Sequence, residues 1–134
     1  MLLKKYLAGG IYASTDKGLM VSDCLFCKII SGEIPSEKIY EDEQVYVFHD
    51  IGAQAPHHFL VIPKKHISTL NDVNNDDAAL IGKLTLTASK IAKELGFADE
   101  GYRVVMNCNE QGGQAVYHIH LHCLGGRSLS WPPG

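Results

Sequence analysis

The feature that most constrains the fold is a strict alternation of residue types near the C-terminus, from Tyr117 to Leu124. Histidine occupies three alternate positions there, and apolar or aromatic residues occupy the positions between them. Because side chains in a β-strand alternate between two faces, this period of two predicts a strand over residues 115–124. The imidazoles should then share one face, roughly 7 Å apart along the strand. They are His118, His120 and His122, and the residues expected to face the core are Tyr117, Ile119, Leu121 and Cys123.

Three rings that titrate near neutrality on one face make a reactive surface. A zinc hydrolase that uses all three rings as ligands is one hypothesis for it. However, the two outer rings of such a strand lie roughly 13 Å apart, whereas a zinc–ligand bond is only about 2 Å long. The spacing therefore disfavours a metal held by the whole row.

The composition is that of an ordinary globular domain. The chain has 134 residues, of which 46% are hydrophobic and 20% charged, enough for one domain with a buried core. Its net charge of −3 argues against a general nucleic-acid binder, because no basic run would neutralise phosphates. No apolar run has the length needed to cross a bilayer, so no membrane partner is expected.

Residues 1–22 differ in character from the rest of the chain. Before Asp16 this segment has two lysines and no acidic residue, and it carries no persuasive secretory signal. We predict a flexible N-terminal extension over 1–22 and a single domain over 23–134. Organelle import directed by the extension is the alternative left open. Without an export signal we expect free cysteines and a cytoplasmic location, with the nucleus also open.

The remaining patterns predict an α+β domain. A short helix is expected over 24–31, with Asp23 as its candidate N-cap. One long helix follows the caps offered at 74–76, carries a single apolar stripe and ends at Gly96. Besides the histidine strand, strands are expected over 38–42, 44–50, 58–63 and 102–107. These elements predict a five-stranded antiparallel sheet covered on one face by the long helix.

Several separated motifs, found in one order, resemble those of a known family. The segment His118–Leu124 matches the pattern His-x-His-x-His-x-x, with x apolar, that names the histidine triad (HIT) superfamily. Other segments resemble its HINT branch, the histidine triad nucleotide-binding proteins. They are FHDI (48–51), QAP (54–56), HFLVIPKKH (58–66), GGQ (112–114), LGGR (124–127) and WPPG (131–134). The resemblance extends from residue 23 to the C-terminus.

The resemblance implies a HIT-like fold, an activity and an assembly. HINT proteins are purine nucleoside phosphoramidases that also hydrolyse aminoacyl-adenylates, so the implied substrate or product is a purine nucleotide of the AMP or GMP type. They form homodimers in which the two sheets join into one continuous sheet. Catalysis in the branch requires no cofactor. Hydrolysis of dinucleoside polyphosphates is a second activity within the superfamily, but the LGGR and WPPG segments favour the HINT branch.

The triad residues have the chemistry needed to break a P–N bond. A neutral imidazole can attack phosphorus, and a protonated one can give the departing amine its proton. By resemblance His120 is the nucleophile, and the backbone carbonyl of His118 keeps one nitrogen of that ring protonated. The resemblance also implies that His122 contacts the phosphate and that His58 joins the cluster from another strand.

A bound nucleotide needs a flat apolar slot, a ribose anchor and a phosphate contact. Asp50 can accept hydrogen bonds from both ribose hydroxyls. Asn107 matches a family residue that reaches the ribose-phosphate region. The turn containing Gly113 and Gln114 would let backbone N–H groups approach a phosphate. Candidate walls for the base are Leu25, Phe26, Phe48 and Ile51, although isolated apolar residues are more often plain core.

One position departs from the family pattern. The family commonly has a serine three residues before the first triad histidine, where its hydroxyl reaches the leaving group. This chain has Ala115 there. We expect slower turnover or an altered leaving-group preference rather than loss of activity.

Cys24 and Cys27 form a Cys-x-x-Cys pair that the triad does not use. Some HIT proteins bind zinc through such a pair and two distant histidines, and the matching positions here are His66 and His118. A Cys₂His₂ set is chemically suited to a structural zinc ion. Two ordinary thiols or a redox pair are the alternatives, and the redox pair is disfavoured because no thioredoxin-like βαβ pattern surrounds it.

A function from another class uses the same residues. A nucleotide-binding scaffold or regulatory protein with little physiological turnover would need the same pocket, so the sequence does not separate it from an enzyme.

Overall fold

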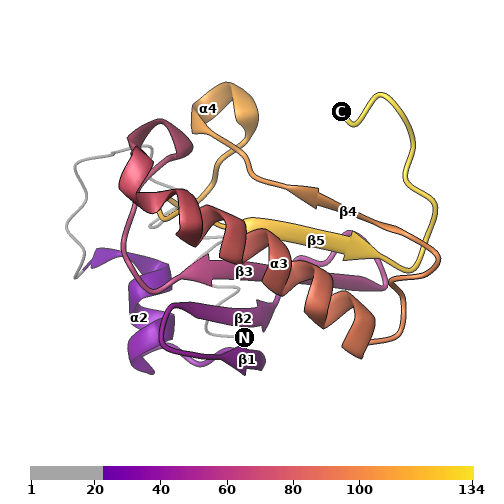
Figure 1. Cartoon of the computed structure of the whole chain (residues 1–134), viewed down its shortest axis with the longest axis horizontal. Helices are drawn as coiled ribbons and strands as arrows, with labels where there is room; N and C mark the ends of the chain where they lie inside the picture. Colours follow the sequence, from indigo (N-terminus) through magenta and orange to yellow (C-terminus); the bar gives the residue numbers. More distant parts are fainter. Residues whose placement is uncertain (1–22) are drawn as a thin grey trace.

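The computed structural model describes residues 23–134, and in that part the chain forms one antiparallel sheet with a long helix across it (Figure 1). The sheet has five strands in the order β1-β2-β3-β5-β4. Every neighbouring pair in this order is antiparallel, so the predicted α+β fold is confirmed. The strands are β1 (Lys38–Glu41), β2 (Val45–His49), β3 (His57–Pro63), β4 (Tyr102–Val105) and β5 (Leu121–Gly125).

The helices are α2 (Leu25–Ser31), α3 (Ala78–Glu94) and α4 (Asn109–Gly112), with 3₁₀ turns η2 (Leu70–Asp72) and η3 (Asn75–Asp77). The predicted cap region before the long helix first forms η3, whose N-cap Asn74 accepts a hydrogen bond from the backbone N–H of Asp76. Gly96 adopts a φ of +87° and donates its N–H to the carbonyl of Ala92, so α3 ends where the glycine predicts.

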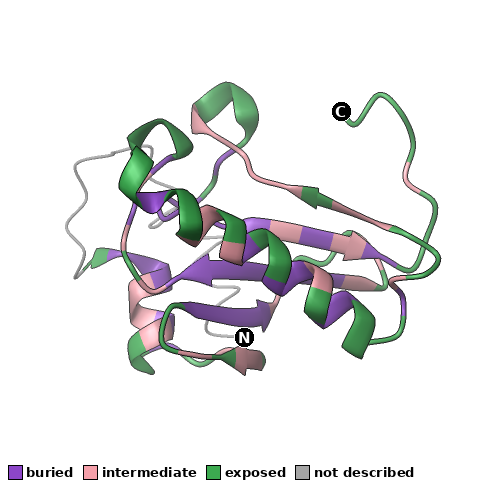
Figure 2. Cartoon of the chain, in the orientation of Figure 1, coloured by how far each residue is buried: buried purple, intermediate pink, exposed green. Residues whose placement is uncertain are grey.

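Side-chain alternation gives the sheet two apolar layers. Val47 of β2 and Val61 of β3 pack in one cluster with Leu84 of α3. The intervening residues point to the opposite face, where Phe48 packs in a second cluster with Phe26 of α2. Figure 2 shows β2 and β3 buried along most of their length between these layers. The sequence predicted that α3 covers one face of the sheet, but it did not predict that α2 covers the other face.

The histidine strand is shorter than the alternation predicts. Residues 115–120 lie outside any strand, and β5 begins at Leu121. The β3–β5 pairing stops at Val61 opposite Leu121, and the N–H of Ile119 donates instead to the carbonyl of Ile67 in the following loop, at 2.8 Å. Because they have no strand partner, the residues just before Leu121 do not follow the backbone path of the sheet.

Two smaller expectations also change. The predicted flexible turn before the triad is the helical turn α4, which ends at Gly113 with a φ of +82°. The N-cap of α2 is Cys24 rather than Asp23, because the Cys24 sulfur accepts the N–H of Cys27.

The domain boundary at residue 23 stays a prediction, and the predicted flexible extension over 1–22 lies outside the described residues. Across residues 23–134, no helix combines the length and the apolarity needed to span a bilayer.

Packing of α3 on the sheet gives a direct stability test. Leu84 is fully buried, so Leu84→Ala should lower the free energy of unfolding by about 2–5 kcal/mol, since it removes apolar contacts and leaves a cavity. The control is Leu86→Ala on the same helix. Leu86 is 72% exposed, and its truncation should change stability by less than about 0.5 kcal/mol. Urea denaturation measures both, and equal effects would contradict this orientation of the helix.

Candidate active site

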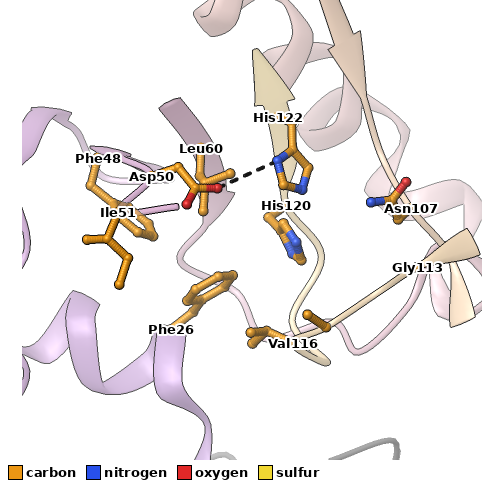
Figure 3. Close-up of a pocket in the computed structure, with 11 residues that line it drawn as sticks. Phe26, Phe48, Asp50, Ile51, Leu60, Asn107, Gly113, Val116, His120 and His122 are labelled. Atoms are coloured by element: carbon orange, nitrogen blue, oxygen red, sulfur yellow. Dashed lines mark ion pairs between the residues drawn. The ribbon is translucent and has the colours of Figure 1, made fainter. Parts of the chain in front are cut away.

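A cavity of about 240 Å³ lies beside β5, on the sheet face that α2 covers (Figure 3). Phe26 from α2 and Phe48 from β2 stand on one side of the histidines, and Asn107 stands on the other (Figure 3). The lining residues are Phe26, Phe48, Asp50, Ile51, Leu60, Asn107, Gly113, Ala115, Val116, His120 and His122. Most of the residues assigned to a nucleotide site from sequence therefore meet around one cavity.

The ring of His120 is held in a single tautomer. Its Nδ1–H donates to the backbone carbonyl of His118 at 2.8 Å. A neutral imidazole carries one N–H, so Nε2 keeps its lone pair. Burial, together with neighbouring His122, lowers the pKa of His120 to about 4, and the edge-on ring of Phe26 lies 5.1 Å away between centroids. The ring is therefore a neutral imidazole near pH 7 with one unprotonated nitrogen, which is the form that attacks phosphorus.

A chain of hydrogen bonds gives the neighbouring ring, His122, the opposite tautomer to that of His120. The backbone N–H of Gln54 donates to Nδ1 of His58 at 3.0 Å, so neutral His58 carries its proton on Nε2. That nitrogen lies 2.9 Å from Nδ1 of His122, which then accepts, and His122 carries its proton on Nε2. His120 thus offers a lone pair and His122 offers an N–H.

The His58–His122 pair also has a carboxylate beside it. Asp50 places Oδ2 at 3.3 Å from Nε2 of His58 and at 3.9 Å from Nδ1 of His122. Burial lowers the pKa of both rings, while the charge of Asp50 opposes that shift. The other carboxylate oxygen accepts the N–H of Gly52 at 2.8 Å, which fixes the carboxylate in the cavity wall.

The apolar side of the cavity differs from the sequence expectation at one position. Phe26, Phe48 and Ile51 line it as predicted, but Leu25 does not. Leu25 is fully buried in the core cluster behind the wall, because its neighbour Phe26 takes the face of α2 that looks onto the cavity. Two lining residues were missed, Leu60 and Val116. Leu60 shares the strand face of His58, so the alternation in β3 could have identified it, whereas Val116 lies in irregular backbone that leaves no pattern.

On the opposite side Asn107, Gly113 and Ala115 line the cavity, but Gln114 does not. The Gln114 side chain is buried and braces the loop, donating to the carbonyl of Ser68 at 2.7 Å and accepting the N–H of Asn109 at 2.9 Å. The amide of Gln114 therefore holds the loop, and its backbone N–H donates to the carbonyl of Asn109 at 3.0 Å, so Gly113 and not Gln114 is the residue of this turn that lines the cavity.

The three imidazoles lie on the α2 side of the sheet, as the alternation predicts. The rings of His118 and His120 both pack edge-on against Phe26, at 5.9 and 5.1 Å between centroids, but only His120 and His122 line the cavity. His118 is fully buried and does not line the cavity. Its Nε2–H donates to the carbonyl of Pro63 at 2.7 Å, and its Nδ1 points at the two cysteines. Both nitrogens of the first ring are therefore directed to Pro63 and to the cysteines, and not to the cavity. A zinc ion shared by the whole row is excluded by this arrangement.

His118 instead completes a second cluster with Cys24, Cys27 and His66, whose donor atoms all lie within 4.8 Å of one another. Nδ1 of His118 lies 3.4 Å from the sulfur of Cys24, 3.6 Å from that of Cys27 and 3.2 Å from Nδ1 of His66. The Cys27 sulfur lies 3.4 Å from Nδ1 of His66. In a tetrahedral zinc site the ligand bond lengths require sulfur–nitrogen edges of about 3.6 Å and nitrogen–nitrogen edges of about 3.3 Å. The four residues fit such an ion.

A second set of potential metal ligands, Asp50, His58 and His122, has its donor atoms equally close. These rings are already committed to each other, since Gln54 donates to Nδ1 of His58 and leaves the proton on the nitrogen that would have to bind the ion. This set does not fit a metal without breaking the hydrogen-bond chain.

Known proteins share both the sequence and the fold. A family model described as the HIT domain matches residues 31–129. An uncharacterized HIT-like protein of Synechococcus elongatus is 50% identical over 115 residues, covering 86% of this chain and 100% of that protein. The purine nucleoside phosphoramidase of Escherichia coli K12 is 49% identical over 110 residues, covering 82% and 92%. The crystal structure of a HIT family hydrolase from Legionella pneumophila matches with a TM-score of 0.82 at 56% identity, covering 83% and 99%.

An antiparallel sheet crossed by one long helix, with a histidine-lined cavity beside its central strands, defines a histidine triad hydrolase. Because the family model covers most of the chain and relatives are about half identical over nearly their full length, the chain belongs to the HIT family. The predicted fold family and the prediction that the chain is an enzyme are confirmed.

Proposed function

We propose that this chain hydrolyses the P–N bond of purine nucleoside phosphoramidates, and also aminoacyl-adenylates, releasing a nucleoside monophosphate. The observation that carries the proposal is the 2.8 Å hydrogen bond from His120 Nδ1–H to the carbonyl of His118, which leaves Nε2 free in a nucleotide-sized cavity. The half-identical phosphoramidase of E. coli supports the choice of substrate.

In this proposal the base enters the apolar slot and the ribose lies against Asp50. Phe26, Phe48 and Ile51 provide flat and branched apolar surface for a ring. Asp50 lies in the wall as an acceptor of hydroxyl hydrogen bonds. The phosphate then lies between His122 and Gly113, with Asn107 beside it. This placement brings phosphorus next to the free nitrogen of His120.

The first chemical step transfers the nucleotide to His120. Nε2 attacks phosphorus and forms a new N–P bond while the P–N bond of the substrate breaks. The departing amine takes a proton from the charged form of the His58–His122 pair, which Asp50 stabilises from 3.3 Å. The Nε2–H of His122 can donate to a phosphate oxygen as charge develops on it.

The second step returns the enzyme to its starting state. Water attacks phosphorus, the bond to Nε2 of His120 breaks, and the His58–His122 pair takes the proton that the water loses. Each proton given up in the first step is recovered in the second. The chain's own side chains and water suffice for both steps.

We also propose a homodimer built through β4. In the described part of the chain β4 lies at one edge of the sheet and pairs only with β5. Val104 on this strand is 37% exposed. Because unpaired edges present free backbone donors and acceptors, pairing of two β4 strands would satisfy them and make one continuous sheet. A cytoplasmic location stays a prediction.

Removing the nucleophile tests the reaction directly. His120→Ala should lower kcat for a purine nucleoside phosphoramidate by about 1,000-fold or more, because the attacking atom is lost. His57→Ala is the matched control, since His57 stacks on Phe97 at 4.4 Å between centroids and lies outside the cavity. A quenched wild-type reaction should show a nucleotidyl adduct on His120 by mass spectrometry. Activity that survives in His120→Ala would show that the catalytic assignment is wrong, and loss of turnover with retained biological activity would favour a scaffold.

The alanine at position 115 gives a second test. Ala115→Ser should raise turnover about 5-fold or change the preference between leaving amines, because a hydroxyl in the cavity adds one hydrogen bond. The measurement is kcat for two phosphoramidates whose amines differ in basicity. Ala79→Ser, at an exposed position on α3, is the control. Identical kinetics in the wild type and Ala115→Ser would count against a role for this position.

We further propose that Cys24, Cys27, His66 and His118 hold a structural zinc ion. Protein purified without a chelator should then contain about one zinc per chain. Cys27→Ser should lose most of it, because three protein ligands hold a structural zinc less tightly than four. Cys108→Ser, outside the cluster, should keep it. Metal analysis that finds less than about a tenth of an equivalent in the wild type would remove the proposal.

A further inference from the structure

His118 takes part in two groups of residues at once. Its ring belongs to the cluster with Cys24, Cys27 and His66, and its backbone carbonyl orients the catalytic His120 at 2.8 Å. No other residue described here belongs to both groups. Anything that fixes the ring of His118 therefore acts on the tautomer of His120.

The backbone of His118 receives little support from the sheet. The β5 ladder begins only at Leu121, so the residue lies before the paired part of the strand. Two contacts tie this segment to residues 63–67. The His118 ring donates to the carbonyl of Pro63 at 2.7 Å, and the N–H of Ile119 donates to the carbonyl of Ile67 at 2.8 Å. The second ring nitrogen, Nδ1, faces the cluster.

The contact at Nδ1 has a single geometry only when a cation is bound to the cluster. Donation to Pro63 leaves Nδ1 of neutral His118 as a lone pair, facing Nδ1 of His66 at 3.2 Å and the cysteine sulfurs at 3.4 and 3.6 Å. A bound zinc ion takes all four donors together in one geometry. Without it, the two thiols and the two Nδ1 atoms can share protons in several alternative arrangements.

From this we infer that Cys24, Cys27 and His66 are positioning residues for His120, acting through the metal-held ring of His118. The inference rests on the proposed phosphoramidase activity and adds to it a residue set that touches no substrate. Cluster integrity controls where the His118 carbonyl lies, and so controls the tautomer of the nucleophile.

Loss of the metal should leave the nucleotide slot largely in place. Helix α2 carries Phe26 into the cavity wall, and its own apolar face holds it on the sheet, because Leu25, Phe26 and Ile29 are all buried there. The effect should therefore fall on the chemical step, with little effect on nucleotide binding. This separation distinguishes positioning of His120 from a general loss of structure.

His66 is the best residue to change, since it lies outside the cavity and contributes one ligand. His66→Ala should lose zinc and lower kcat by about 10-fold to 100-fold, the usual cost of removing a partner that orients a reacting group. The Kd for a nucleoside monophosphate should change by less than about 3-fold. His66→Cys restores four ligands of a kind zinc accepts, and should recover zinc and most of kcat.

The tautomer of His120 distinguishes positioning from a purely structural role of the cluster, because a general loss of stability would not change it. Nitrogen-15 NMR of labelled histidine should show one Nδ1–H tautomer in the wild type and His66→Cys, and a mixture in His66→Ala. Both variants are compared below their melting temperatures. A His66→Ala protein that lacks zinc yet keeps wild-type kcat and a single His120 tautomer would overturn the inference, as would an equal loss in His66→Cys that still holds zinc.

The same measurements separate this inference from the proposed function. If the wild type fails to hydrolyse phosphoramidates, the proposed function fails, and the NMR signal still tests whether the cluster sets the tautomer. If hydrolysis occurs but the tautomer does not depend on zinc, the inference alone fails.

Discussion

The site depends on one hydrogen bond, from Nδ1–H of His120 to the backbone carbonyl of His118 at 2.8 Å. A neutral imidazole has one proton to place, and this bond places it on the nitrogen away from the cavity. In a continuous strand the carbonyl at position 118 would pair in the ladder with a neighbouring strand. Here the ladder starts at Leu121, so the carbonyl is available to the ring. This break in regular structure therefore leaves the carbonyl to fix the tautomer of His120.

That break also marks the limit of prediction from sequence. The period of two correctly placed Ile119, Leu121 and Cys123 in the core, because burial of an apolar side chain depends only on which face it occupies. It did not show that His118 lies outside the cavity, because the nitrogens of that ring face the distant carbonyl of Pro63 and two cysteines next to or in α2. Long-range polar contacts of this kind leave no periodic pattern in the chain.

The difference between periodic burial and long-range contacts also explains why Leu25 and Gln114 do not line the cavity. The sequence predicted a short helix near residue 24, but not how that helix is rotated on the sheet. The rotation of α2 about its own axis decides whether Leu25 or Phe26 lines the cavity. The packed structure shows that it is Phe26. Likewise an amide such as Gln114 can bind a ligand or brace a loop with equal chemistry. Its hydrogen bonds to Ser68 and Asn109 decide for the loop.

The His58–His122 pair and the His118 cluster differ in the chemical partners of their rings. His58 and His122 share a hydrogen bond next to the carboxylate of Asp50, where a proton can be held and passed on. His118 lies among thiols and another ring, which suits a metal and not a proton relay. His120 lies between the groups, with its ring centroid 5.0 Å from that of His122. In the proposed mechanism, three identical residues in one row therefore have three different roles, and the contacts of each ring are the basis for the proposal.

Helix α2 is held by two kinds of force with different consequences. Its apolar face packs against the sheet, and that attraction has no preferred direction, so it locates the helix without fixing angles closely. The proposed coordination of zinc by Cys24, Cys27 and His118 would instead be directional, because a tetrahedral ion fixes angles as well as distances. An error of about 1 Å at a reacting group can cost about 100-fold in rate. Because apolar packing has no preferred direction, a zinc-bound cluster next to the proposed nucleophile would restrict the angles that the packing of α2 leaves open.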